Sequence, residues 1–225
     1  IEVKTNPQYP IRGHELGYRP MNNTWDAWTP DQFEQYIREL AFFGANAVNN
    51  IPFPWDETND LMPVDRREMN RRISDICDKY DFDYWVWTPA DYDLSDPEIR
   101  AEAIRRSEDF YRNTPRLDEV LIPSADPGSN HPSLLIPFAE ELAGLLHKYH
   151  PDAGMWIGME GHIGEKGEYL FNYLRENRPD WLAGVTAGPL AHRPVELRKH
   201  VPAEYPIRQY PDLTHTVRCQ YPVPW

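Results

Sequence analysis

The segment Ile122–Pro132, with the sequence IPSADPGSNHP, carries a carboxyl group and an imidazole around a sharp turn. Apolar residues lead into Asp126, the pair Pro127 and Gly128 favours a turn, and His131 follows. A carboxyl group enclosed by apolar and aromatic walls holds its proton more firmly, which suits a general acid. The structural alternative is that Asp126 only forms the turn or caps the next helix.

A second carboxylate is needed if the chemistry is hydrolysis of a glycosidic bond, because that reaction uses a pair of acids. Further acids follow predicted strands: Asp91 and Asp93 in TPADYDLSDP, Glu160 in GMEGH, and Asp212 in QYPDLTH. Glu160 comes directly after its strand, whereas Asp96 is placed to cap the helix that begins at Pro97. The candidate catalytic residues are therefore Asp126, Glu160 and Asp212.

Aromatic and cationic side chains could bind a flat, hydroxylated ligand. The chain has 8 Trp and 13 Tyr residues, although core packing explains any single ring as well. Arginine pairs with hydroxyls or with a carboxylate through parallel hydrogen bonds, or alternatively with the protein's own acids. The candidate substrate-binding residues are Arg12, Tyr18, Asn49, Trp87, Asp91, His131, Trp156, Arg208, Tyr210 and His215.

Other reaction classes find little support in the sequence. His162, His192 and His215 follow predicted strands, but no H-x-x-H or H-E-x-x-H pattern occurs, so we expect no metal and no cofactor. The G-x-S-x-G elbow of a serine nucleophile is also absent. Cys77 lies on the apolar face of a predicted helix, which argues against a cysteine nucleophile.

Composition sets the broad class of the protein. The 225 residues are 40% hydrophobic and 26% charged, with a formal net charge of -13. So acidic a chain is not expected to bind nucleic acid or an anionic membrane, and no run approaches the roughly 18 apolar residues of a membrane span. Two cysteines exclude a disulfide-dense scaffold and a four-cysteine zinc site. The first residues lack the pattern of a secretion signal.

Prolines, 23 in number, and short polar clusters divide the chain into alternating strands and helices. Thr29 before Pro30 marks one helix start, and Gly44 marks the end of that helix. The predicted strands are 11–18, 45–51, 84–88, 119–123, 153–158, 182–186 and 205–210. The other predicted helices are 65–80, 97–113, 132–149, 168–176 and 194–200.

Seven strands that alternate with six helices predict a parallel sheet with helical crossovers, either doubly wound or a (β/α)8 barrel. RGHELGYRP lacks a glycine-rich phosphate loop, and polar residues follow nearly every strand, which favours the barrel. We therefore predict a single (β/α)8 TIM-barrel domain over 1–225, incomplete at its C-terminal end, with 1–10 as a lead-in segment. Its eighth strand is either Val217–Tyr221 or part of a chain that continues past Trp225.

Four short stretches match motifs of one group of enzymes. Pro10–Gly13 (PIRG) with Leu16 resembles the P-x-R-G-x-x-L start of the β-hexosaminidase barrel, where the arginine holds ring hydroxyls. Phe43–Ile51 (FGANAVNNI) is similar to the G-I-N-x-x-x-x-N-N-V stretch of α-glucuronidases, with one residue fewer. Ser124–Gly128 (SADPG) occupies the place of their acid segment N-S-E-G-Q-P-G. The resemblance implies a TIM-barrel glycosidase in which Asp126 is the proton donor.

The fourth stretch, Ala187–Pro194 (AGPLAHRP), resembles the sixth-strand N-G-P-I-D-F-Q-P of α-glucuronidases. The family's aspartate acts there in general-base work, and this chain has Ala191. The family's seventh-strand Q-E-Y falls near 208–210, again without the acid, and the Asp-Glu pair of hexosaminidases is absent. The chain also resembles bacterial barrel proteins found near polysaccharide-degrading enzymes, which would suit a secreted or periplasmic protein.

Two functions from different classes are consistent with these residues. The first is a glycoside hydrolase acting on a terminal sugar, uronic or N-acetylated by the resemblance. Asp126 would protonate the leaving group, and Glu160 or Asp212 would activate water or stabilise the oxocarbenium ion. The alternative, suggested by Ala191, is a carbohydrate-binding barrel without catalysis, or a scaffold domain of a larger polysaccharide-processing protein. A metal-dependent sugar isomerase is a weaker third hypothesis, because metal ligands do not cluster in the sequence.

Overall fold

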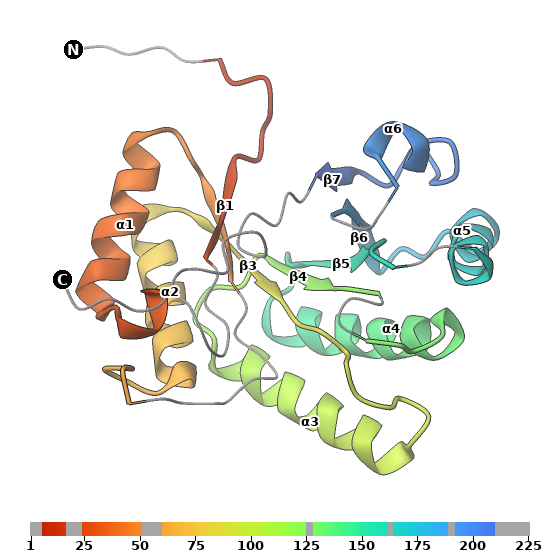
Figure 1. Ribbon diagram of the computed structural model, residues 1–225, viewed down its shortest axis with the longest axis horizontal. Helices are drawn as coiled ribbons and strands as arrows, with labels where there is room; N and C mark the ends of the chain where they lie inside the picture. The colour runs from red at the N-terminus through yellow and green to blue at the C-terminus, as the bar shows by residue number, and fades with distance from the viewer. Residues whose placement is uncertain are drawn as a thin grey trace.

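The strands lie in the sheet in the order in which they occur in the chain. The computed structural model describes residues 6–16, 24–50, 60–124, 128–161, 164–188 and 192–209. Within these ranges seven strands form one sheet, and every neighbouring pair is parallel (Figure 1). They are β1 (Gly13–Leu16), β2 (Ala47–Asn50), β3 (Asp83–Trp87), β4 (Glu119–Ile122), β5 (Gly154–Gly158), β6 (Leu182–Ala187) and β7 (Ile207–Gln209).

A helix joins each strand to the next. These helices are α1 (Pro30–Phe42), α2 (Arg66–Tyr80), α3 (Pro97–Asn113), α4 (Pro132–Tyr149), α5 (Glu165–Asn177) and α6 (Pro194–Leu197), and a short 3-10 helix, η1 (Thr24–Ala27), precedes α1. The side chains of Thr29, Asp65, Asp96 and His131 each accept a hydrogen bond from a first-turn N–H group of their helix. Such caps satisfy donors that the helix itself leaves unpaired, and so they set where the helices begin.

The two faces of the sheet carry different side chains, because alternate residues of a strand point to opposite sides. The outer face packs against the helices in the main hydrophobic core, which includes Val48, Tyr84, Val120, Met155 and Val185. The inner face holds a smaller cluster of Ala47, Trp85, Trp87, Leu121 and Trp156. By the same alternation Asn49, Glu119 and Arg208 belong to the inner face. The polar and aromatic groups that could meet a ligand therefore share one side of the sheet.

A side chain of the last strand reaches the first strand. A Cβ atom at Gly13 in β1 would stand 3.0 Å from Nη2 of Arg208 in β7. The sheet therefore curls until its two edge strands approach each other across the inner face. A doubly wound sheet reverses its strand order at a switch point, and this sheet does not. The architecture is a curled parallel α/β half-barrel, compatible with an incomplete (β/α)8 barrel, and the predicted strand Val217–Tyr221 lies outside the described residues.

Most described strand boundaries agree with the predicted ones to within two residues, and the larger differences lie in the helices. Helix α5 begins at Glu165 rather than at 168, because its N-cap is Gly164, which has a φ of 66° and no side chain to mark the start. Helix α6 ends at Leu197, earlier than expected. Residues Thr24–Ala27, which belong to none of the predicted strands and helices, form η1. By contrast, both ends of α3 and α4 agree with the prediction. Their starts are marked by a capping residue followed by proline, Asp96-Pro97 and His131-Pro132.

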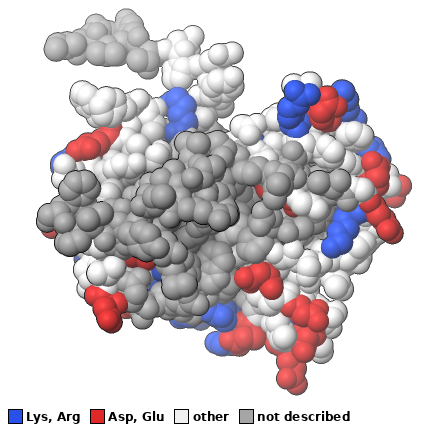
Figure 2. Space-filling view, viewed as in Figure 1, with Lys and Arg blue, Asp and Glu red and all other residues white. Residues whose placement is uncertain are grey.

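Charged side chains of both signs lie close together on the described surface. Figure 2 shows acidic and basic groups side by side over α6, where Lys199 Nζ and a Glu196 carboxylate oxygen are 2.7 Å apart. A pair of the same kind on α3 joins Arg105 to Glu102 at 2.6 Å. Exposed pairs of this kind contribute only about 0–1 kcal/mol each. Among the described helices, none combines the length and the apolarity that crossing a bilayer takes.

Candidate active site

The ends of β4 and β5 are joined beyond their paired residues. Ile122 of β4 pairs with Ile157 of β5. Two residues after Ile122, the hydroxyl of Ser124 donates a hydrogen bond to the carbonyl oxygen of Gly158. Asp126 comes two residues after Ser124 and lies outside the described residues. The chain therefore enters the Asp126 segment beside the point at which it leaves β5.

Glu160 is buried at this same edge of the sheet, with 5% of its surface exposed. Its carboxylate occupies the space that a Cβ atom at Gly158 would need. Its Oε1 accepts a long hydrogen bond of 3.4 Å from Oγ1 of Thr186, the residue of β6 that pairs with Gly158. Glu160 thus lies at the carboxyl edge of the strands, where (β/α) barrels gather their reactive groups.

The loop that follows β4 is tied to the loop that follows β3. Gly128 has a φ of 132°, and a Cβ atom there would lie 2.9 Å from the carbonyl oxygen of Ala90, so only glycine fits. The buried Asn130 amide donates hydrogen bonds to the carbonyl oxygens of Ala90 at 2.9 Å and Tyr92 at 2.8 Å. Its oxygen accepts a third, of 3.0 Å, from the N–H of Leu94. The two loops therefore hold each other in place at the rim.

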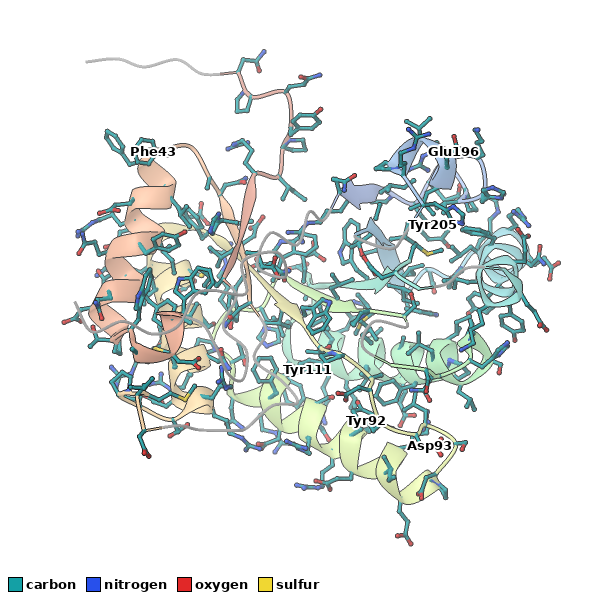
Figure 3. All side chains as sticks on the ribbon, viewed as in Figure 1. Phe43, Tyr92, Asp93, Tyr111, Glu196 and Tyr205 are labelled. Carbon is teal, nitrogen blue, oxygen red and sulfur yellow. The ribbon has the colours of Figure 1, made fainter. Side chains whose placement is uncertain are left out.

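Three predicted polar residues on these loops have different roles. Figure 3 shows Asp93 and Tyr92 on the turn that leads from β3 into α3. Asp93 accepts hydrogen bonds from the hydroxyl and the N–H of Ser95, and these lower the pKa of its carboxyl group. His131 caps α4, because its Nδ1 accepts a hydrogen bond from an N–H two residues later. Asp93 and His131 thus each make hydrogen bonds within their own turn, and Asp91 is exposed at the rim.

Indole rings fill the centre of the inner face. The ring centroids of Trp85 and Trp156 are 5.2 Å apart, and neither side chain is more than 5% exposed. Trp156 fits because its ring occupies the place of a Cβ atom at Gly184. Trp87, the last residue of β3, belongs to the same cluster. We call Trp85, Trp87 and Trp156 the aromatic floor.

Asn49 lies next to the aromatic floor with an amide group that finds no hydrogen-bond partner among the described residues. It is 1% exposed and pairs with Trp85 between β2 and β3. A buried amide without a partner costs on the order of 1–3 kcal/mol, so such a group marks a place for water or for a polar ligand. Its neighbour Asn50 serves the outer face instead, where it donates a 2.6 Å hydrogen bond to Asn70 of α2.

Arg208 and Glu119 add opposite charges to the aromatic floor. The Cζ atom of Arg208 lies 3.5 Å from the ring centroid of Trp85, a cation–π contact. Oε2 of Glu119 accepts a 2.5 Å hydrogen bond from Nε1 of Trp156. Burial raises the pKa of Glu119 to about 7, although the Trp156 hydrogen bond and the Arg208 charge act to lower it.

Arg12 lies at the amino ends of the strands, opposite the carboxyl ends that carry Glu160. It immediately precedes β1, and its guanidinium group donates hydrogen bonds to the carbonyl oxygens of Gly44 at 2.6 Å, Tyr9 at 2.8 Å and Pro10 at 3.1 Å. Because the strands are parallel, their amino ends share one edge and their carboxyl ends the other. The structure therefore does not bring Arg12 together with Glu160.

The remaining predicted residues fall outside the described ranges. These are Tyr18, Asp126, Tyr210, Asp212 and His215. Within those ranges, no three His, Cys, Asp or Glu side chains are grouped as a metal ion would require. Burial of Cys77 in α2 raises the pKa of its thiol, which leaves it unreactive.

Sequence reasoning missed Glu119 and three glycines. Gly154, Gly158 and Gly184 leave the space that the Glu119 carboxylate, the Glu160 carboxylate and the Trp156 ring occupy. The available signal was the alternation in β4, since Glu119 has the parity of Leu121 on the inner face. From the sequence, Glu119 had no role beyond that of the first residue of a predicted strand.

No protein-family model and no curated protein sequence matches this chain. Solved structures with a similar fold include the exo-beta-1,4-mannosidase Op5Man5 from Opitutaceae bacterium strain TAV5, with a TM-score of 0.51 and 15% identity over 70% of this chain and 34% of that one. The endo-beta-1,4-mannanase from Thermotoga petrophila has a TM-score of 0.53 and 8% identity, over 81% of this chain and 52% of the mannanase. An endo-1,4-beta-mannanase from Eisenia fetida has a TM-score of 0.51 and 9% identity, over 82% and 70%.

These identities establish a likeness of fold alone. The chain spans about a third of the length of the mannosidase and about half of the Thermotoga petrophila mannanase. The chain is thus similar in fold to TIM-barrel glycoside hydrolases, and its described residues form a curled half-barrel that is compatible with an incomplete (β/α)8 barrel.

Proposed function

We propose that the chain is a glycoside hydrolase whose site lies at the carboxyl edge of β4 and β5. The observation that carries the proposal is the hydrogen bond from Ser124 to Gly158, which starts the Asp126 segment beside the buried Glu160. Two acids that follow neighbouring strands in this way suit a reaction that needs a carboxyl pair. The fold that the chain shares with glycoside hydrolases supports the same conclusion.

In this proposal Asp126 donates the proton to the leaving oxygen. Glu160 either activates a water molecule or attacks the anomeric carbon directly, and Asp212 stays the alternative for this second role. The separation of the two carboxyl groups decides between these mechanisms. About 5 Å gives retention of the anomeric configuration, and roughly 6.5–9.5 Å leaves room for water and gives inversion.

The sugar is proposed to rest near the aromatic floor. Indole faces pack against the C–H surfaces of sugar rings, and a guanidinium group and an amide supply polar contacts. Arg208 and Asn49 lie on the same inner face and would provide these contacts, whereas Arg12 has no part in the proposal. The sequence resemblance suggests a uronic or an N-acetylated sugar as the substrate, and the structural neighbours suggest a β-1,4-linked mannoside.

The second candidate function is sugar binding without hydrolysis. It is favoured by Ala191, which stands where the α-glucuronidases have an aspartate that acts in general-base work. In this reading the aromatic floor and Asn49 still hold a sugar, and the carboxyl groups only bind hydroxyls.

Turnover of a panel of aryl glycosides and manno-oligosaccharides, with binding followed by calorimetry, tests the proposal. The protein is compared with Asp126→Asn, Glu160→Gln and the control Asp152→Asn, whose exposed carboxyl group lies in the turn before β5. Hydrolysis by the unmodified protein and the control, with at least a hundredfold loss in the other two variants, would support it. Equal turnover in all four proteins would remove both acids from the mechanism, and binding without any hydrolysis would favour the second candidate.

A further inference from the structure

Glu119 is a half-buried acid for which the proposed chemistry has no use. It lies at the first position of β4, where its strand partners are Trp85 of β3 and Gly154 of β5. Its carboxylate occupies the space that a Cβ atom at Gly154 would need, so any larger residue at position 154 would displace it. The sheet thus makes room for this carboxyl group on its inner face, away from the carboxyl edge that carries Glu160.

The contacts of Glu119 run through the aromatic floor to the last strand. Its Oε2 accepts the hydrogen bond of Trp156 Nε1, the Trp156 ring packs on Trp85, and the Trp85 ring carries the guanidinium group of Arg208. We propose that Glu119 is a positioning residue. Its carboxyl group sets the orientation of the Trp156 indole and, through Trp85, the position of the Arg208 guanidinium group. The consequence for a sugar rests on the proposed function, whereas the positioning itself does not.

Burial and the surrounding charges determine whether the carboxyl group of Glu119 is neutral or ionised. Burial and the acids Asp118 and Asp83 favour the neutral carboxyl group, and the Trp156 hydrogen bond and Arg208 favour the carboxylate. Glu15 of β1, which pairs with Asn49, adds a further acid to the inner face. The balance places the pKa of Glu119 at about 7, so both forms are present near neutrality.

The two forms act differently on Trp156. A carboxylate accepts the indole N–H more strongly than a neutral acid does, because a charged acceptor makes shorter and stronger hydrogen bonds. It also attracts the guanidinium group of Arg208. The NMR signal of the Trp156 indole proton should therefore change when Glu119 ionises. If Glu119 only filled space and accepted no hydrogen bond from Trp156, the signal would not change in this way.

The indole N–H resonances of the 8 Trp residues, followed by NMR between pH 5 and pH 9, test the positioning. The Trp156 signal is assigned with Trp156→Phe. We expect it to move with a midpoint near pH 7 in the unmodified protein and to stay constant in Glu119→Gln, which keeps an acceptor oxygen but cannot ionise. Asp83→Asn removes a neighbouring acid that does not touch Trp156, so the titration should persist there. A Trp156 signal that does not titrate, or that titrates equally in Glu119→Gln, would overturn the proposal.

A second measurement covers the case in which Glu119→Gln fails to fold. In Trp156→Phe the carboxyl group of Glu119 loses its donor, so its midpoint, followed by carbon-13 NMR, should rise. An unchanged midpoint would contradict the hydrogen bond.

The sugar part has its own readout. Glu119→Gln should raise the KM or Kd for a sugar by about tenfold, since about 1.4 kcal/mol of binding corresponds to that factor, and should change kcat by less than twofold. An unchanged KM in Glu119→Gln would show that Glu119 does not affect sugar binding. If the unmodified protein binds no sugar at all, the proposed function fails while the Trp156 titration stands.

Discussion

The hydroxyl of Ser124 donates a hydrogen bond to the carbonyl oxygen of Gly158, and so joins the chain segments that carry the two candidate acids. In a parallel sheet, the backbone groups beyond the last paired residue have no ladder partner. A serine at this place supplies one and prevents the two loops from separating. The candidate site therefore depends on a contact that involves neither acid directly.

Ser124→Ala should lower both stability and turnover. Loss of a buried neutral hydrogen bond costs about 1 kcal/mol, and a displaced catalytic group can cost up to about a hundredfold in rate. Thermal unfolding and aryl glycoside turnover measure the two effects. Ser95→Ala is the control, since its hydroxyl bonds Asp93 on an exposed loop. If the two variants behave alike, the Ser124 contact does not support the site.

Gly158→Ala should displace Glu160. The added Cβ atom would collide with the Glu160 carboxylate and approach Cα of Pro123 to 3.1 Å. We expect a loss of about 1–3 kcal/mol in the free energy of unfolding together with nearly complete loss of turnover. In Gly144→Ala on α4 nothing lies within 4 Å of the new atom, so this control should be neutral or slightly stabilising. Full activity in Gly158→Ala would place Glu160 outside the reaction.

Asn130→Ala should separate the loops after β3 and β4. Three hydrogen bonds from a side chain with 7% exposure would be lost, at a total cost of about 3 kcal/mol. Asn113→Ala provides the comparison, because its amide is exposed and bonds only within its own helical turn. Urea denaturation of both variants gives the difference, and equal midpoints would mean that the loops are held by other contacts.

Stability should depend on pH through Glu119. The pKa of this group rises from 4.5 to about 7 on folding, so between these values the folded protein holds a proton that the unfolded chain has released. The free energy of unfolding should therefore fall as the pH rises from about 5 to about 7, by up to about 3 kcal/mol at 1.4 kcal/mol for each pKa unit. Glu119→Gln should not show this fall. Parallel pH profiles for the two proteins, obtained by urea denaturation, would contradict it.

The sequence predicts the alternation of strands and helices because local chemistry marks the element ends. Thr29 with Gln32 forms a full capping box at the start of α1, and a left-handed glycine, Gly44, follows its end. These signals need no knowledge of tertiary structure. The start of α5 carries no such signal, because its N-cap residue, Gly164, has no side chain that could cap the helix. The predicted start of this helix was therefore wrong.

The curl and the inner face were harder to read from the sequence. The approach of Arg208 to Gly13 joins strands almost two hundred residues apart, which no local pattern reports. The position of Arg12 follows from the sequence, because a residue at the start of a predicted parallel strand lies at the amino end of the sheet. The role of Glu119 depends on Trp156 in the next strand and on Gly154, so it emerges only from the register.

The central claim is that Asp126 and Glu160 act as a pair with different roles. Steady-state kcat/KM values for two glycosides of the same sugar, one with an activated dinitrophenyl leaving group and one with a poor alkyl leaving group, test it most directly. Asp126→Asn should lose on the order of 10²–10⁴ in rate on the alkyl glycoside but far less on the activated one, which needs no proton. Glu160→Gln should lose similar factors on both. Equal losses in Asp126→Asn on the two substrates, or none in either variant, would contradict the account.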